Sequence, residues 1–196
     1  MRLFVALGLP PEYKDGLRAI KERWEASFAS GLKWTRPENW HLTLKFIGEQ
    51  DPADLDRIKQ ALDSVSFSRL FLQASGGGFF SGRGRIKVAW AGMSGEVQGL
   101  KTLASEVDKA LTGVGIPAEK RPFQPHLTLF RVKRFRREDP WKEFGDYLKG
   151  RKWPEFACQK ICLWQSTLTR RGPVYEQMYW VPCLEDQGIR TDNPRG

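Results

Sequence analysis

The tetrapeptide His-Leu-Thr-Leu occurs at residues 41–44 and again at residues 126–129. The chain has 196 residues and only two histidines, so each copy holds one of them. A scarce residue that recurs inside one repeated motif indicates an internal duplication. The flanking sequence agrees with this interpretation, because Val5 precedes His41 and Val88 precedes His126 by nearly equal separations.

Both halves of the chain show the same order of expected elements, strand-helix-strand-helix-strand. Apolar residues spaced three and four apart predict the helices, and short apolar or alternating runs predict the strands. In the first half these segments are residues 3–7, 11–28, 40–47, 54–65 and 67–73. In the second half they are residues 85–91, 96–111, 126–132, 141–148 and 156–165, followed by one further strand at 174–183.

The length suits a single domain, which we expect over residues 1–184. Its two lobes are expected at about residues 1–75 and 85–183, with the chain free to cross between them. The glycine-rich segment 76–85 lacks the Gly-Lys-Ser/Thr ending of a nucleotide-binding loop, and we expect it to link the halves. The polar residues 185–196 are expected to form a flexible tail.

The composition indicates a cytoplasmic protein with an anionic partner. Lysine and arginine number 32 against 23 acidic residues, a net charge of +9, which favours a partner such as RNA, DNA or acidic lipid. Three cysteines without a disulfide framework (Cys158, Cys162 and Cys183) are interpreted as core thiols in a reducing compartment. No apolar run approaches the ~20 residues of a membrane span, and the apolar start is interpreted as a strand rather than a signal peptide. We expect a monomer.

Side-chain alternation along a strand divides the first motif between two surfaces. It assigns Leu42, Leu44 and Phe46 to the core, and His41 and Thr43 to the opposite surface. The same alternation places Lys45 beside Thr43, either lining a cleft or at the solvent edge.

The second motif repeats this arrangement, with His126 and Thr128 on one surface. If the halves pair about a pseudo-two-fold axis, the two His-Thr surfaces face each other across a cleft. Two imidazoles can serve as general base and general acid near neutral pH, and threonine hydroxyls can donate to anionic oxygens. This combination predicts a phosphoryl site that needs no metal. The alternative is structural, since threonine is also a good strand residue.

The segments around the motifs resemble those of the 2H phosphoesterases, and most closely the RNA 2′,3′-cyclic phosphodiesterases, a family long called 2′-5′ RNA ligases. The resemblance covers nearly the whole chain and rests on residues 2–6, 36–48, 88–92, 122–131 and 172–176. It implies a bilobal α+β fold in which two antiparallel sheets face a central cleft with pseudo-two-fold symmetry.

The resemblance also implies an activity, the hydrolysis of RNA 2′,3′-cyclic phosphate ends to 2′-phosphate ends without metal or cofactor. By that carry-over His126 is the base that activates water, and His41 is the acid that protonates the leaving 3′ oxygen. Thr43 and Thr128 would hold the phosphate oxygens. Arg131 matches a phosphate-contacting arginine of the family.

The resemblance implies that Arg131 contacts the phosphate, but strand alternation predicts otherwise. A residue five positions after His126 points to the opposite face of a regular strand. Either the strand bends or bulges after Phe130, or Arg131 is less central. The basic run 131–137 either follows an RNA backbone or is a solvated loop.

Two alternative functions remain at this stage. The same chemistry could join 2′-5′ RNA ends or open a cyclic phosphate on a small nucleotide. A different class is a non-catalytic RNA-binding module that uses the basic cleft.

Overall fold

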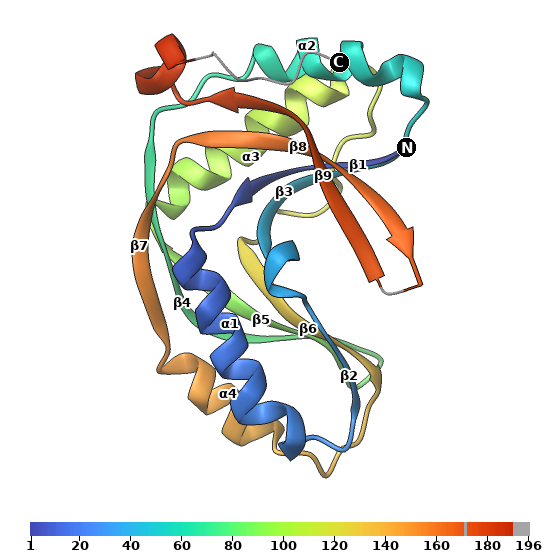
Figure 1. The fold of residues 1–196 in the computed structure, drawn as a ribbon, viewed down its shortest axis with the longest axis vertical. Coiled ribbons are helices and arrows are strands. Elements are labelled where there is room, and N and C mark those ends of the chain that lie inside the picture. The colour runs from blue at the N-terminus through green and yellow to red at the C-terminus, as the bar shows by residue number, and fades with distance from the viewer. Residues whose placement is uncertain (171, 190–196) are drawn as a thin grey trace.

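The computed structural model describes residues 1–170 and 172–189 as an α+β fold built on two antiparallel sheets (Figure 1). The four-stranded sheet has the order β3-β1-β8-β9, with bounds His41–Glu49, Arg2–Gly8, Lys160–Thr169 and Gly172–Pro182. The five-stranded sheet has the order β2-β6-β5-β4-β7, with bounds Gly31–Trp34, His126–Arg134, Arg85–Gly95, Leu70–Gly82 and Lys152–Cys158. The expected fold class of two antiparallel sheets is confirmed.

Within the described residues four α-helices flank the sheets: α1 (Pro11–Trp24), α2 (Leu55–Asp63), α3 (Val97–Thr112) and α4 (Trp141–Lys149). In Figure 1, α2 and α3 lie at the end of the molecule that holds the four-stranded sheet, and α1 and α4 lie at the other end. Each helix buries one apolar face. In α3 this face consists of Leu100, Leu103, Ala104, Val107 and Leu111.

The two sequence halves exchange their last strands. β4 ends the first half but pairs with β5 in the five-stranded sheet. β8 comes from the second half but pairs with β1 in the four-stranded sheet. The single strand expected at 156–165 is therefore two strands, because β7 pairs with β4 while β8 pairs with β1. The chain changes sheets at Gln159, between them.

The glycine-rich segment is not a linker, which corrects the expectation for residues 76–85. It continues β4 and turns back into β5 through a two-residue hairpin at Arg83 and Gly84. Both turn residues have positive φ, 52° and 71°, as the mirror-image hairpin turn requires. Gly77 is fixed by packing instead, since a Cβ there would lie 2.4 Å from the Trp90 carbonyl oxygen.

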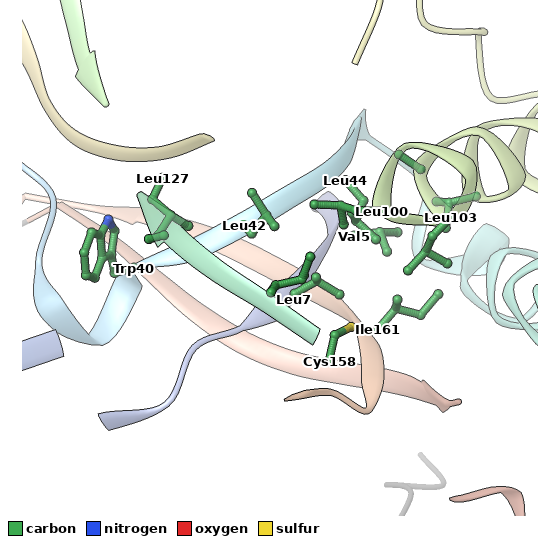
Figure 2. Packing of buried hydrophobic residues seen from close by; sticks show 14 of the residues in the cluster. Val5, Leu7, Trp40, Leu42, Leu44, Leu100, Leu103, Leu127, Cys158 and Ile161 are labelled. Atoms are coloured by element: carbon green, nitrogen blue, oxygen red, sulfur yellow. The ribbon is translucent and has the colours of Figure 1, made fainter. Parts of the chain in front are cut away.

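The core lies between the sheets and their helices and joins both halves. Figure 2 shows Val5 and Leu7 of β1 beside Leu42 and Leu44 of β3, with Leu100 and Leu103 of α3 in the same cluster. The three cysteines are buried and free, in agreement with their interpretation as core thiols.

The first residues of the expected tail form regular structure. Residues Leu184–Ile189, which include the start of the expected tail, form a short 3₁₀ helix. The Arg69 backbone N–H donates to the Glu185 carboxylate at 2.9 Å, and the Arg69 side chain pairs with Asp186 at 2.8 Å. Residues 190–196 of the expected tail lie outside the described residues. Within the described part of the chain, no helix is long and apolar enough to cross a membrane.

Candidate active site

A cavity of about 550 Å³ opens between the two sheets, and it brings together all five residues that the sequence singled out. His41 and Thr43 reach it from β3, and His126, Thr128 and Arg131 reach it from β6. The two His-Thr surfaces therefore share one space, as the duplication predicts. Other lining residues include Arg2, Phe4, Lys33, Thr35, Asn39, Phe46, Ser166, Leu168 and Tyr175.

Both imidazoles are held by the same kind of contact. The Nδ1 atom of His41 lies 2.7 Å from the Asn39 carbonyl oxygen, and that of His126 lies 2.8 Å from the Gln124 carbonyl oxygen. A carbonyl can only accept, so each Nδ1 carries the hydrogen and donates. In the neutral ring, the lone pair is then on Nε2. Each histidine thus offers Nε2 for a proton transfer.

The Asn39 carbonyl is itself fixed in place. Residues Pro37–Asn39 form a short 3₁₀ turn immediately before β3. The Asn39 side-chain amide donates to the Pro173 carbonyl at the start of β9, at 2.7 Å. The His41 ring is therefore tied, through its partner, to the β8–β9 hairpin on the same sheet.

Aromatic rings contact both histidines, a feature that the motifs did not reveal. His41 forms a three-ring cluster with Phe4, whose ring centroid lies 4.8 Å away, and Tyr175, whose ring lies edge-on at 5.3 Å. Phe4 and Tyr175 also contact each other, with centroids 4.9 Å apart. His126 meets the Phe80 ring edge-on at 4.8 Å. The only sequence signal for any of these was that the segments 2–6 and 172–176, which include Phe4 and Tyr175, carry the family resemblance.

Burial lowers the pKa of both histidines. Desolvation lowers the pKa of His41 from 6.5 to about 4, against the raising effect of its bond to the Asn39 carbonyl; the charge of His126 lowers it further. Desolvation also lowers the pKa of His126, against its bond to Gln124, and the nearby Arg131 charge adds to the lowering. In the ligand-free protein both rings are therefore neutral at pH 7.

A bulge in each motif resolves the conflict over Arg131. In β6, Thr128 pairs with Trp90 and Phe130 with Ala89, so Leu129 is an extra residue without a partner of its own. One extra residue reverses the alternation beyond it. Arg131 therefore returns to the face that carries His126 and lines the cavity.

The equivalent bulge in β3 corrects two expectations. Thr43 pairs with Ala6 and Lys45 with Val5, so Leu44 is the extra residue. Phe46, expected in the core, is 61% exposed and lines the cavity at the position equivalent to Arg131.

Lys45, expected on the His41 face, instead points inward and is only 4% exposed. Its ammonium pairs with Asp108 of α3 and donates to the Pro117 carbonyl at 2.7 Å. The Asp108 carboxylate also accepts from the Glu119 backbone N–H at 3.0 Å. This buried ion pair ties the bulged part of β3 to α3 and the segment that follows it.

Only Arg131 of the basic run 131–137 lines the cavity; the other four basic side chains of the run are exposed outside it. Two further cations, Arg2 and Lys33, reach the cavity from β1 and β2. Sequence reasoning assigned neither residue to the site, although Arg2 belongs to the segment 2–6 that carries the family resemblance. Among the residues that the structure describes, no group of three or more His, Cys, Asp or Glu side chains is arranged to hold a metal ion.

Comparison with known proteins gives consistent results. The model of the LigT-like phosphoesterase family matches twice, over residues 7–90 and 92–175, once for each half. The relative from Aeropyrum pernix is 36% identical over 154 residues, covering 76% of this chain and 85% of its own. The relative from Archaeoglobus fulgidus is 34% identical over 181 residues, covering 91% and 98%. Both are named RNA 2′,3′-cyclic phosphodiesterase.

Solved structures share the fold. A Thermus thermophilus structure superposes with a TM-score of 0.74 at 26% identity, covering 93% of this chain and 97% of the other. E. coli LigT complexed with 3′-AMP superposes with a TM-score of 0.72 at 23% identity, covering 93% and 98%.

Proposed function

The chain belongs to the LigT-like phosphoesterase family, and we propose that it hydrolyses the 2′,3′-cyclic phosphate ends of RNA to 2′-phosphate ends. The names of the relatives support the RNA substrate. The observation that carries the mechanism is the symmetry of the cavity. Two imidazoles with Nδ1 bound to a carbonyl and Nε2 available lie in one space with two threonines and an arginine.

The reaction then needs two proton transfers, one for each histidine. His126 accepts a proton from water as the water oxygen bonds to phosphorus. His41 gives a proton to the 3′ oxygen as its bond to phosphorus breaks. The product carries a 3′-hydroxyl and a 2′-phosphate. Each transfer of this kind typically contributes about 10²–10⁴ in rate, so the proposal requires no metal ion.

The pKa of each ring bears on its proposed role. Desolvation, with the Arg131 charge adding to it, lowers the pKa of His126 and so favours its neutral form, as a base requires. His41 must be protonated to act as the acid, although its pKa is about 4 in the empty cavity. The negative charge of a bound phosphodiester beside the buried ring raises that pKa. His41 would therefore become protonated when the substrate binds.

The remaining groups suit the rest of the substrate. Thr43 and Thr128 can donate hydroxyl hydrogens to the two non-bridging phosphate oxygens. Arg131 of β6 and Lys33 of β2 are paired positions on neighbouring strands, and both add positive charge to the same cavity. The exposed Phe46 ring offers an apolar surface on which a nucleobase can stack.

The direct test uses an RNA that ends in a 2′,3′-cyclic phosphate, incubated with the protein and EDTA. The product is compared with 2′- and 3′-phosphate standards by chromatography. A 2′-phosphate supports the reaction and its direction. A 3′-phosphate would reverse the in-line geometry and with it the roles of the histidines.

The histidine variants separate catalysis from binding. His41→Ala and His126→Ala should each lower kcat by several orders of magnitude while the far-ultraviolet dichroism stays that of the folded protein. Wild-type turnover in either variant would refute the mechanism. If the wild type shows no turnover and both histidine variants bind RNA as tightly as the wild type, a non-catalytic RNA-binding module is favoured instead.

A further inference from the structure

A second cavity, of about 240 Å³, adjoins the reaction cavity. The two share Asn39, Trp40, His41 and Tyr175 as lining residues, so they meet at these four residues. The other residues around the second cavity are Gly8, Leu9, Lys14, Glu38, Lys160, Cys162, Trp164 and Gln177.

Strand β8 runs along both cavities. Its alternate residues Leu168 and Ser166 line the reaction cavity, and Trp164, Cys162 and Lys160 line the second. A strand rises about 3.3 Å per residue, so Ser166 and Trp164 are separated by only about 7 Å. The second cavity is therefore a continuation of the reaction cavity along the same sheet.

Size argues against an independent ligand. Pockets for complete small molecules usually measure about 300–1,000 Å³, and the second cavity is smaller. It suits one part of a molecule whose remainder occupies the reaction cavity.

The charges and rings of the second cavity suit a nucleotide. Lys14 of α1 and Lys160 of β8 line it, and neither forms an ion pair with any residue that the structure describes. The Lys160 ammonium lies 5.3 Å from the centre of the Trp180 ring. Glu38 is the one acidic residue among those that line it in the described chain, which leaves a net positive charge. Trp164 and Tyr175 provide ring surfaces of the kind on which bases stack.

We propose that the second cavity binds the nucleotide on the 5′ side of the reacting end, with its phosphodiester near Lys14 and Lys160 and its base against Trp164. This rests on the proposed function. The cyclic phosphate is the 3′ end of the RNA, so the chain continues only from the 5′ side of the terminal nucleotide. It must then leave the reaction cavity through adjoining space, and the second cavity offers both cations and rings there.

The test compares two substrates, a nucleoside 2′,3′-cyclic phosphate and a dinucleotide that ends in the same cyclic nucleotide. The variants are Lys14→Gln and Lys160→Gln. Lys101→Gln, on the exposed surface of α3 and outside both cavities, is the matched control. In each of the two test variants the ratio of kcat/KM for the dinucleotide to that for the mononucleotide should fall about fivefold, the effect of one exposed charge contact.

Salt dependence gives a readout that altered packing would not produce. Loss of a phosphate contact in Lys14→Gln or Lys160→Gln should make the affinity for the dinucleotide less dependent on salt than in the wild type. Equal ratios in the wild type and both variants would overturn the proposal. So would a fall of the ratio in Lys133→Gln or Arg134→Gln instead, which would place the 5′ nucleotide over the basic run.

Failure of the proposed function gives a different result, no turnover of either substrate by the wild type. In that case the second cavity is tested by binding alone. Tryptophan fluorescence measures the affinities for the 2′-phosphate forms of the mononucleotide and the dinucleotide. Tighter binding of the dinucleotide that is lost in Lys160→Gln supports the second cavity as its site. Equal affinities overturn it.

Discussion

Acidification from pH 7 to pH 5 should destabilise the fold by about 2 kcal/mol through His41 alone. Its pKa is about 4 in the folded protein and about 6.5 in the unfolded chain. Between these values the unfolded chain binds more protons, so the free energy of unfolding falls as the pH falls. The slope is about 1.4 kcal/mol per pH unit inside the window and vanishes above about pH 7.

The assay is urea unfolding at pH 7 and pH 5 in buffers free of phosphate and sulfate, because a bound anion would raise the pKa of His41 and hide the effect. Other groups also titrate in this range, so the informative quantity is a difference between proteins. His41→Gln removes the titration and should lose about 2 kcal/mol less stability than the wild type over the same pH interval. The direction for His126 is the same, and His126→Gln serves as the comparison.

Proton NMR provides an independent measurement. The chain has only two histidines, so the two Cε1–H resonances are assigned directly from the two variants. A midpoint near 4 for His41 supports the reasoning, and addition of phosphate should move it upward. A midpoint of 6 or above in the ligand-free protein, or an equal loss of stability in wild type and His41→Gln, would refute the link between burial and pKa.

Three further predictions concern other parts of the structure. Thr43→Val and Thr128→Val should each lower kcat by about 10²–10³, since each removes one donor to the phosphate oxygens; steady-state kinetics check this, and an effect on KM alone would contradict it. Lys45→Met should cost about 3 kcal/mol in urea unfolding because it leaves the Asp108 carboxylate without its buried partner. Stability equal to the wild type would contradict that account, and Lys45→Met with Asp108→Leu should recover part of the loss. Gly77→Ala should cost about 1–3 kcal/mol in thermal unfolding, because its Cβ would overlap a carbonyl oxygen of the neighbouring strand; an unchanged melting temperature would show that the strand yields without cost.

The candidate site could be predicted from sequence because its chemistry is concentrated in rare residues. His41 and His126 stand out by their scarcity and by the repeated motif, and the threonines follow from their position. All four line one cavity together with Arg131. Phe4, Phe80 and Tyr175 could not be selected, because a chain with 12 phenylalanines and 4 tyrosines gives no local reason to prefer them.

The errors have one main physical cause, the bulges at Leu44 and Leu129. Alternation predicts which face a residue occupies only while the pairing register stays regular. One extra residue exchanged the positions of Lys45 and Phe46 and decided the orientation of Arg131. Nothing in the composition of a short apolar strand marks where such a residue is inserted.

Long-range pairing was the second limit. The pattern at 156–165 correctly predicts strand structure but does not predict the break at Gln159. The break occurs because β7 pairs with β4 and β8 pairs with β1, and a local pattern carries no information about partner strands. The glycines at 76–82 were interpreted as a linker, although in the folded chain they are where β4 lies against β5 and α4.

The exchange of strands between the halves has a consequence for synthesis on the ribosome. β1 lies inside the four-stranded sheet, where Val5 pairs on one side with Lys45 and on the other with Leu163. The first neighbour emerges early and the second only when most of the chain has been made. Until then the nascent chain carries an open strand edge, the kind of surface that promotes aggregation. A nascent chain stalled before residue 160 should therefore depend on chaperones in a way that the finished protein does not.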